Sequence, residues 1–452
     1  MSPLNRRDFL ASSAAAGASM MLSRSVLAQA EASGEELNVA FIGVGRQGKI
    51  LLNHLLTQVD GVRIKAVCDI WEYSRQIGSR LCKRYKQDVK VYEDFREMLA
   101  DDLDLDAAII AIPDFVHHEV TNACLEAGLH VYCEKEMSND IEKARSMVKA
   151  AQKTGKLLQI GHQRRSNPFY VHAYDFMHKD KFFGNITSVN GQWHQQKPLL
   201  PVPSKIMSKY PIPEATLNKF GYESMAHFYE WRWFKKYAGG PMTDLGSHQV
   251  DIFIWYLDKP PISVYALGGL DFATSNAREN EAGYTPECLD HTYAMYEWDT
   301  DMGKVHGHYR VNLTSSHGGF YEEFMGAKGS MRISEIREKN AIFRESTASA
   351  TEWEDEAEKI DVDGQKAMTF DPLKSRKAKG KMDAEAMEME ESMNKPVHVP
   401  HLENFFAAIR DKNIKLTCPA EVGFETAVAC IKANESAISG KPIHFQPGDF
   451  VA

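Results

Sequence analysis

The stretch "NVAFIGVGRQGK", residues 38–49, joins a short apolar run to a glycine-rich turn. Gly43, Gly45 and Gly48 follow the pattern G-x-G-x-x-G, and the residues after them change to helical spacing. In such a strand–turn–helix unit, the first glycine permits a tight turn and the second lets the backbone approach a pyrophosphate. The third lets the helix pack close to the strand, with its N-terminal amides toward the anion. The stretch therefore predicts the phosphate-binding turn of a dinucleotide site.

An acidic residue stands where such a site needs one. "VRIKAVCD" reads as a second strand and ends on Asp69, 21 residues after Gly48. A carboxylate there can accept both ribose hydroxyls and would repel a 2′-phosphate, which favours NAD over NADP. Arg46 and Arg75 could counter that repulsion, so NADP stays open. The alternative is a plain glycine-rich turn with a surface aspartate.

The pattern beyond this unit predicts two kinds of sheet. Up to residue 162, short apolar strands alternate with helical segments, which is typical of βαβ units and a parallel sheet. We therefore expect a Rossmann dinucleotide-binding domain over residues 36–162. Beyond residue 185 the strands are longer, alternating and rich in aromatic residues, as in an antiparallel sheet with one exposed face. This second domain is expected over residues 163–452, with a charged, mobile surface insertion at 346–397.

Composition excludes several classes of protein. The chain has 452 residues and a formal net charge of −9, which disfavours binding to a nucleic-acid backbone. No apolar stretch reaches the roughly 18 residues of a membrane span. The seven cysteines are odd in number and never spaced C-x-x-C, which argues against a disulfide framework and a zinc knuckle.

The first thirty residues have the features of an export signal. Arg6 and Arg7 precede a small-residue, weakly apolar run, and "LAQA" places Ala28 and Ala30 as a small-x-small cleavage site. Paired arginines before such a run are typical of a twin-arginine signal. We therefore expect a signal peptide at 1–30 and a periplasmic or extracytoplasmic protein. The alternative is a disordered tail with a chance Arg-Arg pair.

The stretch "GGPMTDLGSHQVDIFIWYL", residues 239–257, is the first candidate for chemistry. At 100° per residue, Asp244, His248, Asp251 and Trp255 share one helix face, which we expect to border a polar cleft. A histidine one turn after an aspartate can handle protons, because the carboxylate orients the ring and raises its basicity. Alternatively, Asp244 only favours the helix N-terminus and His248 is a surface residue. Two ligands without a third do not predict a metal site.

Lys135, in "YCEKEM", is the second candidate. It follows the end of a strand in the parallel sheet, and open α/β sheets bind ligands at the carboxyl ends of their strands. A lysine desolvated there can have a lowered pKa and move a proton. The alternative is an ordinary solvated lysine.

Together these motifs resemble the Gfo/Idh/MocA family, named for glucose–fructose oxidoreductase and inositol dehydrogenase. The resemblance covers the chain from about residue 38 onward, without the charged insertion. It rests on "GVGRQG", "AIPDFVHHE", "CEKE", "GHQRRSNP" and "GGPMTDLGSHQVD". In one of these the chain departs from the family, which usually has proline after the lysine of "CEKE", where this chain has Glu136. The family's lysine–proline bond is a place for a cis peptide, whereas a non-proline cis bond costs about 3 kcal/mol. The departure therefore leaves open whether Lys135 sits differently here and whether the extra carboxylate of Glu136 changes its basicity.

The resemblance implies an α/β fold with a Rossmann domain and a C-terminal α+β domain whose large, mostly antiparallel open sheet often supports homo-oligomers. It implies a nicotinamide at the domain boundary and hydride transfer at a sugar or cyclitol carbon. Lys135 and His248 would handle the hydroxyl proton, with Asp244 orienting or assisting. The implied cofactor-binding residues are Gly43, Gly45, Arg46, Gln47, Gly48, Asp69, Pro113, His117, Glu134 and Lys135. The implied substrate-holding residues are Arg164, Arg165, Trp231 and Arg232.

Export and a nicotinamide site together restrict the activity, because little free NAD is available outside the cytoplasm. We expect a tightly held cofactor and an oxidoreductase that resets itself on a second carbohydrate or on an external acceptor. A redox-neutral NAD-dependent glycosidase or lyase is the alternative, although the Tyr-Pro-Thr-His-Gly-type segment of such glycosidases is absent from the sequence. A sugar-binding protein with structural NAD is the third hypothesis. His306, His308 and Arg310 lie on one expected strand and could border either the site or an interface.

Overall fold

The computed structural model describes residues 36–452 except 180, 198, 201, 274–281, 302, 350–353, 355–356, 363 and 372–383. The expected signal peptide at 1–30 lies outside the described residues, and so does part of the 346–397 segment. In the described part, no helix is long and apolar enough to cross a membrane.

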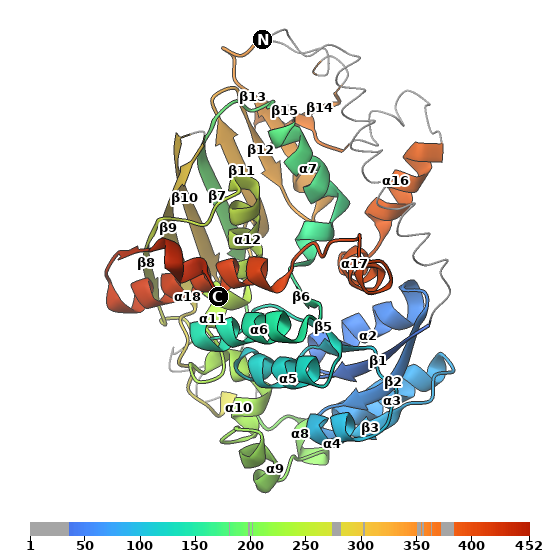
Figure 1. Ribbon diagram of the computed structural model, residues 1–452. Helices are drawn as coiled ribbons and strands as arrows, with labels where there is room; N and C mark the ends of the chain where they lie inside the picture. Colours follow the sequence, from blue (N-terminus) through green and yellow to red (C-terminus); the bar gives the residue numbers. More distant parts are fainter. Residues whose placement is uncertain are drawn as a thin grey trace.

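The N-terminal part of the chain forms a parallel sheet of six strands in the order β3-β2-β1-β4-β5-β6 (Figure 1). The strands are β1 (Leu37–Ile42), β2 (Val62–Cys68), β3 (Lys90–Tyr92), β4 (Ala107–Ile110), β5 (His130–Cys133) and β6 (Leu158–Ile160). The helices are α2 (Arg46–Gln58), α3 (Glu72–Arg84), α4 (Phe95–Ala100), α5 (Asp114–Glu126) and α6 (Ile141–Thr154). The Rossmann-type arrangement expected from the alternating pattern is confirmed.

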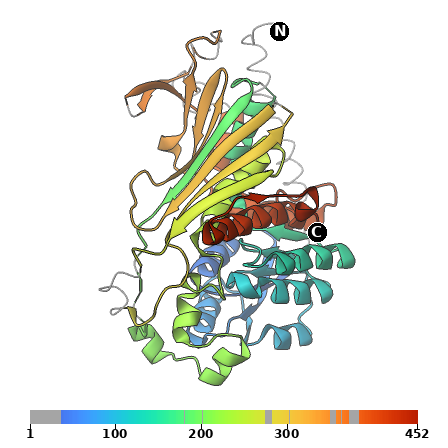
Figure 2. The ribbon, with the colours of Figure 1, turned by 90° about the vertical axis from the view of Figure 1, so that its left-hand side faces the viewer.

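The C-terminal part forms a larger sheet of ten strands, in the order β14-β15-β13-β12-β11-β7-β10-β9-β8-β16 (Figure 2). Every described pairing in it is antiparallel except β7 with β10. The strands are β7 (Ile186–His194), β8 (Ser263–Gly269), β9 (His291–Thr300), β10 (Gly303–Asn312), β11 (Phe320–Gly326), β12 (Gly329–Ile333), β13 (Ala341–Arg344), β14 (Lys359–Val362), β15 (Gln365–Thr369) and β16 (Ile443–His444). The expected α+β domain with a mostly antiparallel sheet is therefore confirmed.

The helices of this part either cover one face of the sheet or connect it to the Rossmann part. They are α7 (Pro168–His178), α8 (Lys205–Lys209), α9 (Glu214–Lys219), α10 (Met225–Tyr229), α11 (Gly240–Asp244), α12 (Gly246–Leu257), α16 (Ala384–Asn394), α17 (Val399–Arg410) and α18 (Ala420–Ser439). Short 3-10 helices are η1 (Gln163–Ser166), η2 (Trp231–Trp233), η3 (Arg337–Lys339) and η4 (Pro447–Phe450). Helix α18 contacts both β8 and α6, so it lies between the two sheets (Figures 1 and 2).

Helix α17 packs on the Rossmann part although it lies near the end of the chain. Its apolar residues Val399, Leu402, Phe405 and Phe406 share a buried core with β1 and α2. The backbone after it continues this contact, because the Ile160 N–H donates to the Cys418 carbonyl at 3.0 Å. The segments that join the two parts therefore include β6 into α7, α17 and α18.

The 346–397 segment is more ordered than the expected mobile insertion where the structure describes it. Strands β14 and β15 extend the edge of the large sheet, and β15 pairs with β13. Ala367, Met368 and Phe370 are buried. The blocks of like charge did not indicate strands. A strand at a sheet edge needs only one apolar face, so charged residues can occupy its other face.

Candidate functional site

A cavity of about 1180 Å³ lies between the Rossmann part and the helices of the C-terminal part. It begins at the glycine turn between β1 and α2 and reaches α11 and α12. The sequence-predicted residues that line it are Gly43, Gly45, Arg46, Gln47, Asp69, Pro113, Glu134, Lys135, Trp231, Arg232, Asp244 and His248. Residues from both parts of the chain thus converge on one space.

The glycine turn has the geometry that a pyrophosphate needs. Gly43 has a φ of +91°, and a Cβ there would lie 2.3 Å from the Ala111 carbonyl oxygen. At Gly48, a Cβ would lie 1.9 Å from the Gly43 carbonyl oxygen. Gly45 instead has no atom within 4 Å of its Cβ position. The first and third glycines therefore permit close packing, and the second keeps space open at the start of α2.

Asp69 is held at the carboxyl end of β2 by the backbone. Its Oδ2 accepts from the Val44 N–H and its Oδ1 from the Trp71 N–H, both at 2.8 Å. Arg75 donates to the carbonyl oxygens of Asp69 and Ile70 and pairs with Glu93 at 3.2 Å. Arg75 therefore bonds to neighbouring protein groups. Of the two arginines that could counter the repulsion of a 2′-phosphate, Arg46 lines the cavity.

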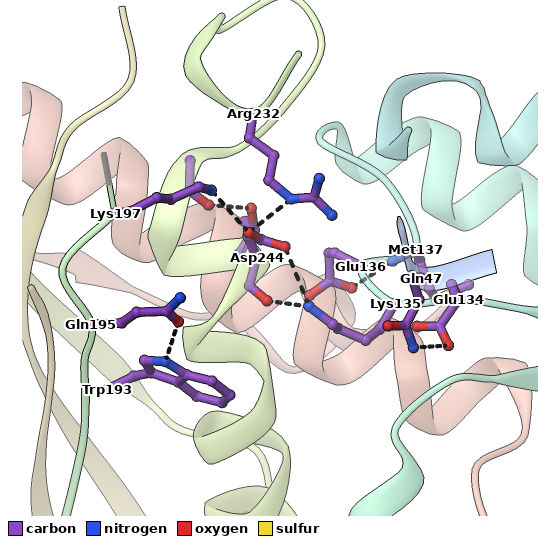
Figure 3. A network of polar contacts seen from close by, with 12 residues as sticks. Gln47, Glu134, Lys135, Glu136, Met137, Trp193, Gln195, Lys197, Arg232 and Asp244 are labelled. Carbon is purple, nitrogen blue, oxygen red and sulfur yellow. Dashed lines mark hydrogen bonds and ion pairs between the residues drawn. The ribbon is translucent and has the colours of Figure 1, made fainter. Parts of the chain in front are cut away.

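The side chain of Gln47, in α2, contacts residues from two other segments that line the cavity. Its amide nitrogen donates to Glu134 Oε1 at 3.2 Å (Figure 3). The same nitrogen lies 3.0 Å from His398 Nε2. Burial raises the pKa of Glu134 to about 7, against the nearby Lys135. His117 was implied as a further cofactor-binding residue, but it does not line the cavity. It is fully buried, and its Nδ1 lies 2.7 Å from the Glu136 carbonyl oxygen, while the adjacent His118 lines the cavity.

These features fit a dinucleotide. The turn offers an open backbone approach at Gly45, and the amides at the start of α2 face it. Asp69 offers carboxylate oxygens at the position that receives ribose hydroxyls in this kind of fold. The residues present would thus hold the pyrophosphate and a ribose of NAD.

Lys135 and Asp244 meet across the boundary between the two parts. Lys135 Nζ donates to the Asp244 main-chain carbonyl and lies 3.5 Å from Asp244 Oδ1 (Figure 3). The Lys135 side chain is 11% exposed and the Asp244 side chain 16%, so solvent screens this pair little.

Two further cations converge on Asp244. Arg232 Nε donates to Asp244 Oδ2 at 3.0 Å, and Lys197 Nζ lies 3.9 Å from the same oxygen (Figure 3). Burial opposes the ionisation of Asp244, but Arg232, Lys135 and Lys197 outweigh it and hold its pKa well below its usual range. Asp244 is therefore a carboxylate at neutral pH and orients three cationic side chains.

His248 completes the group one turn further along. Its ring stacks on Trp193, with centroids 5.4 Å apart and planes at 26°, and it lines the cavity. Burial, together with nearby Lys135 and Arg164, lowers the pKa of His248 well below its usual value. His248 is therefore neutral at neutral pH, and the raised basicity expected from Asp244 is not found, because burial and the nearby cations outweigh that carboxylate.

A break in the helix separates residues that were expected on one face. Helix α11 ends at Asp244 and α12 begins at Gly246, so helical periodicity does not run unbroken through Leu245. Asp251 is buried and does not line the cavity, because its carboxylate accepts from Arg165 Nε at 2.9 and 3.0 Å. Trp255 stacks on Tyr174 instead of bordering the cavity. The expectation of a four-residue polar face was therefore wrong beyond His248.

The two arginines implied as substrate-holding residues also lie elsewhere. Arg164 is buried in ion pairs with Glu322 and with Glu335, the latter at 3.2 Å. Arg165 forms the pair with Asp251. Neither lines the cavity, because buried carboxylates occupy both guanidinium groups. Trp231 and Arg232 do line it, and Arg232 lies over the Trp231 ring at 4.2 Å.

No sequence motif pointed to three further charged residues on the cavity wall. Lys197 follows β7 in a segment without a motif, and Glu230 precedes the Trp-Arg pair. Asp114 begins α5 within the stretch "AIPDFVHHE", whose pattern indicates no role for it. Burial raises the pKa of Asp114 and of Glu230 to about 7. Among the described residues, Asp114 Oδ2 has no hydrogen-bond partner.

Glu136 lies directly behind Lys135. The Lys135–Glu136 peptide bond is cis, the form that the family's lysine–proline pair was expected to favour. The Glu136 side chain is fully buried, and its Oε1 accepts from the Met137 N–H at 2.7 Å. Burial raises the pKa of Glu136 to about 8. Lys135 nevertheless reaches the cavity wall and Asp244.

Comparison with known families matches both parts of the chain. Residues 37–162 match the description "Oxidoreductase family, NAD-binding Rossmann fold", and residues 212–445 match "Oxidoreductase family, C-terminal alpha/beta domain". The chain belongs to the Gfo/Idh/MocA oxidoreductase family. This member therefore takes NAD in its Rossmann part, as the glycine turn and Asp69 indicated.

Curated relatives of this family member include inositol dehydrogenases. Inositol 2-dehydrogenase of Salmonella typhimurium is 29% identical over 192 residues, which are 42% of this chain and 52% of the relative. Inositol 2-dehydrogenase 2 of Saccharopolyspora erythraea is 33% identical over 136 residues, 30% of this chain and 39% of the relative. The matched region thus spans about half or less of each relative's length.

Solved structures share the fold over almost the whole length. Levoglucosan dehydrogenase in complex with NADH and levoglucosan has a TM-score of 0.65 at 18% identity, covering 90% of this chain and 99% of that one. The WlbA dehydrogenase of Bordetella pertussis, in complex with NADH and UDP-GlcNAcA, has a TM-score of 0.65 at 18% identity, covering 91% and 98%. At these identities the likeness shows the fold alone.

Proposed function

We propose that this chain is an NAD-dependent oxidoreductase that oxidises or reduces a hydroxyl-bearing carbon of a sugar, glycoside or cyclitol. One observation carries the proposal. The cavity that begins at the nucleotide-binding turn also contains Lys135, Asp244 and His248, which the chain brings together from two different parts of the fold.

The side chains in the cavity suit the proton half of such a reaction. When bound, NAD supplies the acceptor or donor of a hydride at the reacting carbon. Oxidation also releases the hydroxyl proton, and the neutral His248 ring can accept it. Lys135, oriented by Asp244, donates hydrogen bonds that favour the developing negative charge on the oxygen. In the reverse direction, the same groups return the proton.

The substrate class follows from the relatives and from the cavity wall. The curated relatives named above are inositol dehydrogenases, and a structural neighbour holds levoglucosan. Beyond Lys135, the cavity is lined by aromatic rings and polar side chains, including Trp193, Gln195 and Trp231. Such a mixture suits a polyhydroxylated ring, since apolar C–H faces stack on aromatic rings while hydroxyls form hydrogen bonds.

Export and a tightly held cofactor are further parts of the proposal. The twin-arginine pattern at 1–30 supports export, and seven buried free cysteines suit a chain that folds in a reducing compartment first. A cofactor acquired before export and then retained would let the protein act as a self-contained redox unit. The hydride would then return to a second carbohydrate or pass to an external acceptor.

The large sheet supports a proposal about assembly. Its uncovered face carries Leu267, Tyr293 and Met295, which are 54%, 48% and 55% exposed. His306 and His308 lie exposed on the neighbouring strand β10, away from the cavity. Exposed apolar side chains grouped on a sheet face are typical of an interface, so we propose a homo-oligomer formed through this face.

The decisive experiment is to purify the mature protein without added cofactor, denature it, and quantify the nicotinamide that is released. Near-stoichiometric NAD(H) would support retention, and spectral change at the nicotinamide on adding inositols or sugars would support catalysis. A protein that binds NAD but shows no spectral change with any carbohydrate would favour a sugar-binding role. A protein that neither contains nor binds NAD would contradict the proposal.

A further inference from the structure

A segment of the C-terminal part crosses over to the nucleotide-binding part. Residues 205–229, which we call the strap, contain the short helices α8, α9 and α10 and lie between β7 and α11 in the chain. They do not cover the large sheet. They lie beside the β3–α4 edge of the Rossmann part (Figures 1 and 2).

Side-chain contacts anchor the strap to loops at the carboxyl edge of the Rossmann sheet. Trp71, after β2, donates from Nε1 to the Tyr210 carbonyl at 2.7 Å and packs edge-on against Phe228 and Tyr229. Lys219 pairs with Asp94 at 2.8 Å. Further contacts come from Phe115 at the start of α5, whose ring meets Tyr222 at a centroid distance of 5.3 Å.

Between these anchors, the strap forms a wall of the cavity. Its lining residues include Asn218, Lys219, Phe220, Tyr222, Phe228 and Tyr229. They lie on the same cavity as Asp69, Trp71 and Phe95, which belong to the carboxyl edge of β2 and the start of α4. The strap therefore borders the region next to Asp69, far in sequence from the glycine turn.

We infer that the strap is the outer wall of the NAD site, where it encloses the adenosine half of the cofactor and slows its release. The inference rests on the proposed function, in which NAD is retained. The ribose position beside Asp69 lies within the cavity that the strap borders, so the nucleotide can leave readily only when the anchors at Trp71 and Asp94 open. Retention is then a property of this chain's inter-domain contacts as well as of the glycine turn.

The chain offers a clean test, because one anchor does not line the cavity. Asp94 is buried, is absent from the cavity wall and caps α4 by accepting from the Arg96 N–H. Asp94→Asn can keep the cap while weakening the pair with Lys219. Trp71→Phe keeps an aromatic ring but removes the hydrogen bond to Tyr210. A matched control is Asp175→Asn, which weakens the Lys179–Asp175 pair, also 2.8 Å, at the end of α7 and outside the strap.

The measurement is the NADH release rate, followed by nicotinamide fluorescence after mixing the NADH-loaded protein with excess NAD. We expect release to accelerate about threefold in Asp94→Asn and about tenfold in the Asp94→Asn, Trp71→Phe double variant. Asp175→Asn should stay within twofold of the wild type, and thermal unfolding should confirm that every variant is folded. Release from the double variant within twofold of the wild type would overturn this inference alone. A wild-type chain that binds no NADH would overturn the proposed function and this inference together.

Discussion

Asp244 shows how one side chain can organise a reactive centre. Three cationic groups approach its two carboxylate oxygens, and burial leaves little water to screen them. Without this carboxylate, Lys135, Lys197 and Arg232 would repel one another across the cavity. The arrangement keeps Lys135 at the boundary between nucleotide and carbohydrate, so its removal gives the most direct test of the site.

Lys135→Ala should abolish most turnover and leave NAD binding intact. Lys135 is proposed to stabilise charge on the substrate oxygen, and loss of such a group typically lowers kcat by about 10²- to 10⁴-fold. Steady-state rates, together with titration of NAD by fluorescence, separate the two effects. Lys432→Ala, a change at a partly exposed lysine on α18, is the control and should leave both unchanged. Retained turnover in Lys135→Ala would remove Lys135 from the mechanism.

Glu136 should make the stability of the protein depend on pH. Its pKa is raised to about 8 in the folded protein from an ordinary value of 4.5, so the folded state binds more protons between these values. The stability of the folded state therefore falls as pH rises through this window, by at most about 1.4 kcal/mol per pH unit. Glu136→Gln should remove this part of the slope. Urea unfolding at pH 5, 6, 7 and 8 checks it, and parallel curves for the two proteins would contradict it.

At the residue scale, the sequence predicted the positions of some charged side chains and not of others. Lys135, Asp244 and His248 were predicted because each stands in a short motif, and the structure brings them to one cavity. Arg164 and Arg165 stand in a motif as well, but their partners Glu322 and Asp251 are remote in the chain. A local pattern shows that an arginine is present and cannot show which distant carboxylate occupies it.

At the scale of elements, the regular alternation of strands and helices made the Rossmann part predictable. Strand β1, the turn and α2 follow from one stretch of sequence, and the remaining βαβ units follow from their spacing. The strap was not predicted, because its three helices have only five or six residues each and no repeated apolar spacing. Contacts to another domain hold such helices in place, and local sequence does not encode those contacts.

The turn between β1 and α2 permits a test that separates folding from binding. Gly45 has φ −71° and ψ −159°, which any residue adopts, and no atom within 4 Å of its Cβ position. Gly45→Val should therefore keep the melting temperature while its side chain fills the space next to the pyrophosphate position. We expect NAD affinity to fall at least tenfold in calorimetric titration. Gly448→Val, at an exposed glycine with equal space, is the control. Unchanged affinity in Gly45→Val would place the pyrophosphate elsewhere.

At the scale of the whole molecule, the open sheet face is the proposed contact between copies. Met295→Asp introduces a charge where a second copy would bury the thioether, so it should shift the molar mass toward that of one chain. Light scattering coupled to size-exclusion chromatography measures this directly. Ile438→Asp changes an apolar residue on α18 that is even more exposed, at 64%, and should leave the mass unaltered. A wild-type protein that elutes as a monomer would contradict assembly through the sheet.

Helix α17 has a consequence for the order in which the molecule is made. The apolar face of β1 that carries Val39 and Phe41 is covered partly by Phe405 and Phe406, which are translated only after strands β1 to β15. The nucleotide-binding part thus begins to be made before the large sheet and is finished only after it. Its cofactor can be captured firmly only once α17 has been made. For a protein that leaves the cytoplasm as proposed, the interval between the synthesis of α17 and passage through the membrane is then the opportunity to load NAD.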